Sequence, residues 1–162
     1  MQNIRLCKLS QSFFEKYPEE NYSEIERKPT RPYSCLVFNL FEGLYICVPF
    51  RSHIPHNNAF IFKNSLRSKT TRSGLDYSKL VVVSDETDLF FNSVVVDTDE
   101  YNEARKYYKK IKSDVKNYIM TYLNFETSEF KEQEYNRKYQ YSTLPYFKTI
   151  LMSSIPKELV LV

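Results

Sequence analysis

The sequence predicts an α+β domain in which helices pack on one side of an antiparallel sheet. Segments rich in β-branched and aromatic residues fall mostly before residue 97, and the longest segments with helical periodicity follow it. Strands that come first and helices that come last favour an antiparallel sheet over a parallel arrangement of alternating strands and helices. The 162 residues have the size of one domain and contain no internal repeat or long linker, so residues 1–162 are predicted to form a single domain.

Short runs of apolar, β-branched and aromatic residues between turn residues predict the strands. The strongest pair is a hairpin, in which Glu42-Gly43 turns the chain and Pro49 marks the place where pairing ends. The predicted strands cover residues 4–9, 32–41, 44–50, 59–62, 80–84 and 89–96. The polar segments 19–32, 51–58 and 63–73 are predicted loops, and the last of them is basic and expected to be mobile.

Helical signals begin with a brief helix after Ser10, its expected N-cap, which Pro18 stops. The longest helix starts at Asp97, with acids in its first turn, and runs to about Leu123. Its apolar positions recur every three or four residues and predict one buried stripe: Tyr101, Ala104, Tyr108, Ile111, Val115, Tyr118, Ile119 and Tyr122. Two further helices are predicted over residues 128–141 and from Thr143 onward.

The cysteines argue against a zinc ribbon or a disulfide framework. There are three, Cys7, Cys35 and Cys47, each in an apolar run and without a C-x-x-C pair. They are expected to be buried free thiols in a reducing cytosol. Residues 1–10 lack the long apolar core of a signal peptide, and the most apolar neighbourhood, residues 35–50, is interrupted by polar residues and a turn. A cytoplasmic protein without a membrane partner is therefore predicted.

Charge is unevenly distributed along the chain. Residues 51–84 hold six Lys or Arg against one acid, and residues 85–100 hold six acids and no base. The excess of Lys and Arg over residues 51–84 predicts a polyanionic partner such as a nucleic acid. The alternative is a solvated, lysine-decorated surface.

The only two histidines lie three residues apart, in the loop that follows the hairpin. Zinc would need a third and fourth ligand, and no Cys or acid lies nearby at ligand spacing, so no metal is predicted. A Ser-His nucleophile pair is disfavoured because Ser52 and His53 are neighbours and no glycine lies near Ser52.

RNA cleavage by the 2′-hydroxyl needs only a base, an acid and a cation for the phosphate charge. A histidine can act as base or acid, an arginine can grip two phosphate oxygens, and a serine can donate a hydrogen bond to another. Arg51, Ser52 and His53 supply all three side-chain types in succession. The alternative that stays open is that Arg51 pairs with an acid and the histidines merely bond backbone in a turn.

Several stretches, in order and spacing, resemble the TenpN and CptN branch of type III toxin–antitoxin toxins. Together they cover most of the chain from Arg31 to Phe147, although no single piece is diagnostic. They are Arg31-Pro32-Tyr33, residues 48–54, Ala59-Phe60, residues 74–83 and residues 141–147.

The resemblance implies a twisted antiparallel sheet or partly open barrel with helices packed on it, similar to ToxN and MazF-like toxins, and long C-terminal helices. It implies a metal-independent, cofactor-free endoribonuclease that leaves 2′,3′-cyclic phosphate ends. It also implies that a small, structured, repeat-encoded RNA antitoxin is processed by the enzyme and then inhibits it, in a cyclic protein–RNA assembly.

One departure from ToxN affects the predicted site. ToxN carries Thr-Ser followed two residues later by a catalytic Lys, whereas this chain has Arg51-Ser52 and then Ile54 in the Lys place. Of these ToxN residues, only the serine has a match in this chain, Ser52. We therefore predict His53 as general base or acid, Arg51 as phosphate clamp and Ser52 as hydrogen-bond donor to phosphate, with His56 in reserve.

The predicted RNA-binding residues are of two kinds. Residues expected near the cleft are Arg31, Tyr33, His56, Asp76 and Lys79. Residues expected to guide the RNA backbone are Lys63, Arg67, Lys69, Arg72 and Lys79. Two rival functions stay open: a non-catalytic RNA- or DNA-binding module that uses the same basic segment, and an interaction domain that docks through the Tyr-rich helix face.

Overall fold

The computed structural model describes residues 4–27, 34–124 and 132–155. Seven strands and six α-helices lie within these ranges, and every strand pairing among them is antiparallel. The strands are β1 (Arg5–Leu9), β2 (Ser34–Phe38), β3 (Tyr45–Arg51), β4 (Ala59–Ile61), β5 (Gly74–Asp76), β6 (Val81–Val83) and β7 (Leu89–Phe90). The helices are α1 (Gln11–Lys16), α2 (Leu66–Thr71), α3 (Thr98–Lys106), α4 (Tyr108–Leu123), α5 (Glu132–Tyr139) and α6 (Leu144–Ser154). The predicted α+β class is confirmed.

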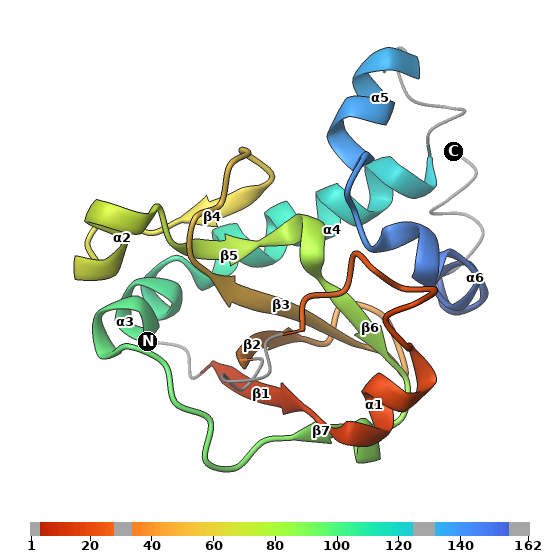
Figure 1. Cartoon of the computed structure of the whole chain (residues 1–162), viewed down its shortest axis with the longest axis horizontal. Helices are drawn as coiled ribbons and strands as arrows, with labels where there is room; N and C mark the ends of the chain where they lie inside the picture. The colour runs from red at the N-terminus through yellow and green to blue at the C-terminus, as the bar shows by residue number, and fades with distance from the viewer. Residues whose placement is uncertain (1–3, 28–33, 125–131, 156–162) are drawn as a thin grey trace.

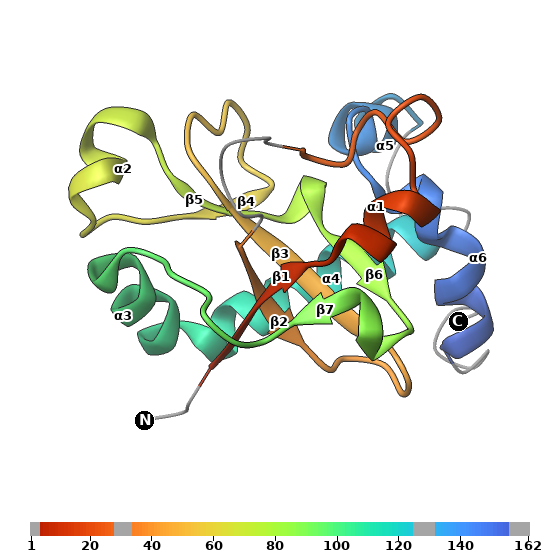
Figure 2. The same ribbon diagram turned by 60° about the horizontal axis from the view of Figure 1, so that its bottom comes forward.

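The sheet is open, with the strand order β4-β5-β3-β2-β1-β7 and with β6 also paired to β3 (Figures 1 and 2). The partly open barrel expected from the resemblance does not close, because within the described ranges the end strands β4 and β7 do not pair with each other. Strand β3 pairs with β2 along one edge. On its other edge it pairs with β6 at its beginning and with β5 at its end.

The predicted hairpin is confirmed, with Gly43 at φ +77° in the turn between β2 and β3. This positive φ is the left-handed region that glycine adopts at no steric cost. Cys7 of β1 lies opposite Cys35 of β2, and both are buried with Cys47 of β3 as free thiols, as predicted. The apolar side chains of these central strands form the middle of one hydrophobic core.

Helix α4 lies along the sheet, and helices α5 and α6 gather at one end of the molecule, opposite α2 and α3 (Figures 1 and 2). The predicted stripe is buried at Ile111, Val115, Tyr118, Ile119 and Tyr122. The tyrosine rings of this stripe pack against those of α5 in the interior. Tyr118 and Tyr122 of the Tyr-rich helix face are therefore part of the core, whereas Tyr101 and Tyr108 are half-buried.

The single long helix expected from residue 97 to 123 is wrong, because the chain breaks at Tyr107 between α3 and α4. The two helices bury different faces. Helix α4 buries the apolar stripe, whereas α3 buries the carboxylates of Glu100 and Glu103, which accept hydrogen bonds from residues 63–73.

Two other segments differ from the predictions. The supposedly mobile loop 63–73 contains α2, whose N-cap Ser65 accepts a hydrogen bond from the amide of Ser68 at 2.9 Å. The segment 89–96 forms a strand only at Leu89–Phe90. The predicted helix start at residue 128 lies outside the described residues. Within the described ranges, no helix combines the length and apolar character that crossing a membrane requires.

Strand β5 was not predicted and is central to the site. It pairs with β3 and β4 at once, so Gly74 faces Arg51 on one side and Ile61 on the other. A Cβ atom at Gly74 would lie 2.2 Å from the backbone oxygen of Phe60. Only a glycine therefore allows β4 and β5 to approach this closely.

Candidate functional site

The site lies beside β3, at the break between β5 and β6, the two strands that pair with one edge of β3. After β5 the chain leaves the sheet as a single 3-10 turn, η1 (Tyr77–Lys79), and returns as β6. Asp76 caps this turn, since its carboxylate accepts hydrogen bonds from the amide and the hydroxyl of Ser78 at 2.9 and 2.6 Å. The start of α6 supports η1 from outside, where the amide of Thr143 donates to the oxygen of Ser78 at 2.9 Å. The turn thus holds the Asp76 side chain in one place.

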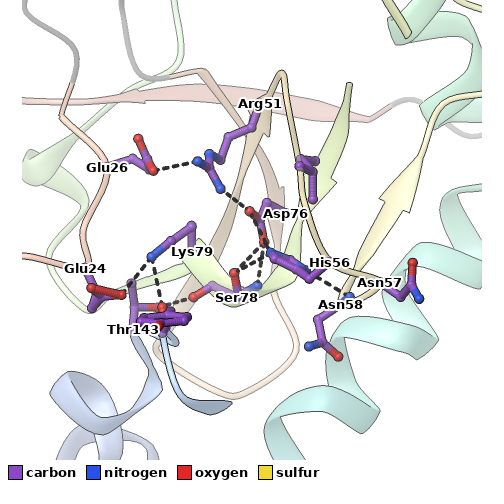
Figure 3. A network of polar contacts seen from close by, with 12 residues as sticks. Glu24, Glu26, Arg51, His56, Asn57, Asn58, Asp76, Ser78, Lys79 and Thr143 are labelled. Atoms are coloured by element: carbon purple, nitrogen blue, oxygen red, sulfur yellow. Dashed lines mark hydrogen bonds and ion pairs between the residues drawn. The ribbon is translucent and has the colours of Figure 1, made fainter. Parts of the chain in front are cut away.

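The Asp76 carboxylate is the centre of a polar cluster (Figure 3). It is fully buried, it accepts a hydrogen bond from Nη1 of Arg51, and its oxygens lie 3.2 and 3.3 Å from Nε2 of His56. Burial alone would raise the pKa of Asp76, but the bonds from His56, Ser78 and Arg51 outweigh it and hold the pKa below its ordinary value. The group is therefore ionised at neutral pH.

Both ring nitrogens of His56 have partners. Nε2 faces Asp76 and lies 3.1 Å from the hydroxyl of Ser78, while Nδ1 accepts a hydrogen bond from the amide of Asn58 at 3.0 Å. A nitrogen that accepts an N–H carries no proton, so this geometry assigns the proton to Nε2 and the lone pair to Nδ1. The side chain is 30% exposed, so part of it is accessible to solvent.

Two cations of the site are matched by glutamates from residues 18–27, the segment that follows α1. Nη2 of Arg51 lies 2.9 Å from Glu26, and Nζ of Lys79 lies 3.0 Å from Glu24 (Figure 3). Lys79 also donates to the backbone oxygen of Tyr141 at 2.9 Å. The alternative in which Arg51 pairs with an acid is thus found at two carboxylates, Glu26 and Asp76.

Ser52 and His53 begin the loop that leaves β3. His53 has φ +57°, its amide donates to the oxygen of Thr71 at 2.5 Å, and its ring is exposed. In the described part of the chain, neither the Ser52 hydroxyl nor the His53 ring bonds another side chain within hydrogen-bond distance. The structure therefore brings Arg51, His56, Asp76 and Lys79 together (Figure 3), whereas the side chains of Ser52 and His53 bond no other side chain of the described residues.

The basic segment, residues 63–72, divides into arginines that hold the fold and exposed lysines. Arg67 donates to the buried Glu100 and lies 3.7 Å from Asp97. Arg72 donates to the backbone oxygens of Ile54 and His56, and to the side chain of Asn57 at 2.8 Å.

The two lysines of this segment, Lys63 and Lys69, have exposed side chains. No carboxylate of the described residues lies within ion-pair distance of either.

The remaining predicted residues, Arg31 and Tyr33, lie outside the described residues. Sequence reasoning missed Ser78, Glu24 and Glu26, and it gave His56 only a reserve role. Local pattern carried no signal for the glutamates, because they sit in a polar segment far from the histidines along the chain. In the ranges that the structure describes, no three His, Cys, Asp or Glu side chains are grouped so as to hold a metal ion.

No protein-family model, no curated protein and no solved structure matches this chain. The chemical interpretation of the site therefore depends on its own geometry and on the resemblance described above.

Proposed function

We propose that the chain is an endoribonuclease that needs no metal and cleaves RNA through attack of the 2′-hydroxyl, leaving 2′,3′-cyclic phosphate ends. The observation that carries the proposal is the pairing of a part-exposed histidine, His56, with a buried, ionised aspartate beside an arginine. A carboxylate behind an imidazole fixes its tautomer and stabilises the imidazolium that forms when the ring accepts a proton.

In this mechanism His56 is the general base. Nδ1 takes the proton of the 2′-hydroxyl, in the position now filled by the Asn58 amide 3.0 Å away. The 2′-oxygen bonds to phosphorus, the bond from phosphorus to the 5′-oxygen breaks, and His53 on the same loop supplies a proton to that oxygen. Arg51 and Ser52 contact the phosphate oxygens and stabilise the charge that develops on them.

The proposal keeps Arg51, Ser52 and His53 as catalytic residues and moves the role of base to His56. The resemblance supplies the biological setting: a cytoplasmic type III toxin whose partners are substrate RNA and a small repeat-encoded RNA antitoxin, in a cyclic assembly. The exposed Lys63 and Lys69 suit contact with the RNA backbone.

A cleavage assay with purified chain and single-stranded RNA in excess EDTA tests the chemistry. Cleavage should proceed, and mass spectrometry of the fragments should show 2′,3′-cyclic phosphate ends. Activity that disappears in EDTA and returns with Mg²⁺ would contradict the mechanism.

The two histidines serve as matched variants for each other. His56→Gln and His53→Gln should each slow cleavage by about 10²- to 10⁴-fold, and each should remove one limb of the pH–rate profile. If neither variant slows cleavage, the proposed site is wrong.

A non-catalytic RNA- or DNA-binding module is the second candidate, and one observation favours it. Nδ1 of His56 is already bonded to the Asn58 amide, and both terminal nitrogens of Arg51 face carboxylates. A cluster that is saturated in this way can serve the fold alone. Under this alternative the chain binds RNA without cutting it, and His56→Gln lowers stability and leaves affinity unchanged.

A further inference from the structure

Residues 18–27 are attached to the body of the protein independently of their glutamates. Ile25 is buried in the core, and its amide donates to the oxygen of Tyr22 at 3.1 Å. The amide of Glu24 lies 3.3 Å from the hydroxyl of Tyr146 on α6. The backbone is therefore held by core and helix contacts. Glu24 and Glu26, the residues before and after Ile25, extend their side chains from it to the site.

The two glutamates reach two cations on different elements. Arg51 ends β3 and Lys79 ends η1, and their side chains are 19% and 12% exposed. Glu24 and Glu26 are 30% and 22% exposed, so each glutamate is more exposed than the cation that it contacts. Figure 3 shows the two contacts on the same side of the Asp76 cluster.

Among the described residues, the charges of these five side chains and of His56 do not balance. Arg51 and Lys79 contribute two positive charges, against three negative charges from Glu24, Glu26 and Asp76. With neutral His56 the cluster carries a net charge of −1, which repels an anion. Without the two glutamates the same cluster would carry +1. Asp76 alone already neutralises Arg51, so the contact with Glu26 leaves an excess of acid.

We infer that Arg51 and Lys79 form a binding site for two neighbouring phosphates of a nucleic-acid strand, and that Glu26 and Glu24 occupy these two positions when no strand is bound. The inference rests on the proposed function, which it extends by naming what the strand displaces. Carboxylates and phosphates accept the same charge-assisted hydrogen bonds from Arg and Lys. A phosphodiester carries a single negative charge, so its exchange for a carboxylate leaves the charge around each cation unchanged.

In this exchange each phosphate takes the place of one glutamate carboxylate at its cation. A phosphate that replaces Glu26 meets Nη2 of Arg51, while Nη1 stays on Asp76, the carboxylate that also faces His56. The first phosphate is therefore delivered next to the proposed base. Lys79 keeps its bond to the oxygen of Tyr141 and gives the second phosphate the donor that now contacts Glu24. The glutamate side chains can rotate into solvent while Ile25 stays buried.

Binding measurements on three double variants test the inference. Glu24→Gln/Glu26→Gln removes the charge and leaves only a neutral amide oxygen as acceptor. Glu24→Asp/Glu26→Asp keeps the charge and shortens the side chains, so that the contacts are lost. Glu19→Gln/Glu20→Gln is the matched control, because these acids are exposed on the same segment and the change in net charge is identical.

The probes are inorganic tripolyphosphate, measured by calorimetry, and a 2′-O-methylated oligoribonucleotide that cannot be cleaved. Both Glu24/Glu26 variants should bind each probe about three- to tenfold more tightly than the wild type, the range expected when two part-exposed ion pairs no longer compete. The control should change affinity by less than twofold. Adding Lys79→Gln to the Asp variant should remove the gain.

Affinities equal to that of the control, or weaker than that of the wild type, would overturn the inference and leave the glutamates as structural partners of Arg51 and Lys79. Circular dichroism checks the fold, and the single variants Glu24→Gln and Glu26→Gln replace the double variant if it does not fold. Tripolyphosphate binding is separate from RNA cleavage. A wild-type chain that cuts no RNA therefore counts against the proposed function, whereas an unchanged tripolyphosphate affinity counts against this inference.

Discussion

The Asp76 cluster and the basic segment, residues 63–72, both contain cationic side chains, yet these cations have different partners. In the Asp76 cluster, the side chains of Arg51, His56 and Ser78 all contact one buried carboxylate. In the basic segment, Arg67 donates to the buried Glu100 and the exposed Arg72 donates to backbone oxygens, whereas the side chains of Lys63 and Lys69 make neither contact within the described residues. A count of charges along the sequence therefore overstates the surface that a polyanion can contact.

The acidic residues that follow in the sequence explain this difference. Glu100 accepts hydrogen bonds from the hydroxyls of Ser65 and Ser73 and from Arg67, and Glu103 accepts from the amides of residues 63 and 64. The acidic stretch therefore anchors the basic one. In the Asp76 cluster the matching acids come instead from residues 18–27 and are part-exposed, so an incoming anion can replace them.

Removing the charge of Asp76 should have the largest effect, because three partners depend on it. Asp76→Asn should slow RNA cleavage by about 10² to 10⁴ and lower the free energy of unfolding by about 3 kcal/mol or more. Urea unfolding and a cleavage assay measure the two losses. Glu86→Gln, an exposed acid with the same change in charge, is the control and should behave as the wild type.

The same variant has a pH signature. The folded pKa of Asp76 lies below its ordinary value of 3.8, so its contribution to stability is complete above about pH 3.8 and is lost as the pH falls through the folded pKa. Asp76→Asn should therefore lose less stability than the wild type on acidification through this range. If the free energy of unfolding falls equally with pH in the two proteins, Asp76 is not held ionised by its partners.

Gly74 lies in β5, which pairs with two strands. One is β3, which carries Arg51 of the Asp76 cluster, and the other is β4, which precedes the basic segment. Gly74→Ala should lower the free energy of unfolding by about 3 kcal/mol, the upper end of overpacking costs, since the methyl group meets backbone that cannot rotate away. Gly43→Ala is the control: its Cβ would meet nothing within 4 Å, and only the positive φ costs about 1 kcal/mol. Equal losses for the two variants would contradict the close approach of β4 and β5.

The parts of the fold that were predictable depend on local pattern. The β2–β3 hairpin follows from two apolar runs around Glu42-Gly43, and the buried face of α4 follows from its three-and-four spacing. The buried cysteines follow from their apolar neighbours. Each of these features is determined by residues close together in the sequence, where spacing alone indicates which side chains share a face.

The rest depends on contacts between distant segments. Strand β5 is three residues long and is defined by its two neighbours, so nothing local distinguishes it from a loop. The pairing of Gly74 with Arg51 is what brings Asp76 to that arginine and to His56. Asp76 was predicted to lie near the cleft only through the resemblance. The catalytic roles of Arg51, Ser52 and His53 stay predictions.

Arg67 and Lys69 separate structural from exposed cations within α2. Arg67→Ala should lower the free energy of unfolding by about 2 kcal/mol, because it removes a charge-assisted hydrogen bond to the buried Glu100. Lys69→Ala removes the same charge from the same helix at an exposed position and should change stability by less than about 0.5 kcal/mol. Urea unfolding of both variants measures the contrast, and equal stabilities would mean that α2 is not held by Glu100.

The smallest effect is expected from the exposed lysines. If Lys63 and Lys69 contact RNA phosphates, Lys63→Ala/Lys69→Ala should flatten the slope of log affinity against log salt by about 1.4, since each single-strand phosphate contact contributes about 0.7. Sequence preference and thermal stability should stay as in the wild type, because neither side chain is bonded to a carboxylate of the described residues. An unchanged slope would show that these lysines face solvent in the complex. The salt dependence of binding would then come from other cations, and the Glu24 and Glu26 variants would test whether Arg51 and Lys79 are among them.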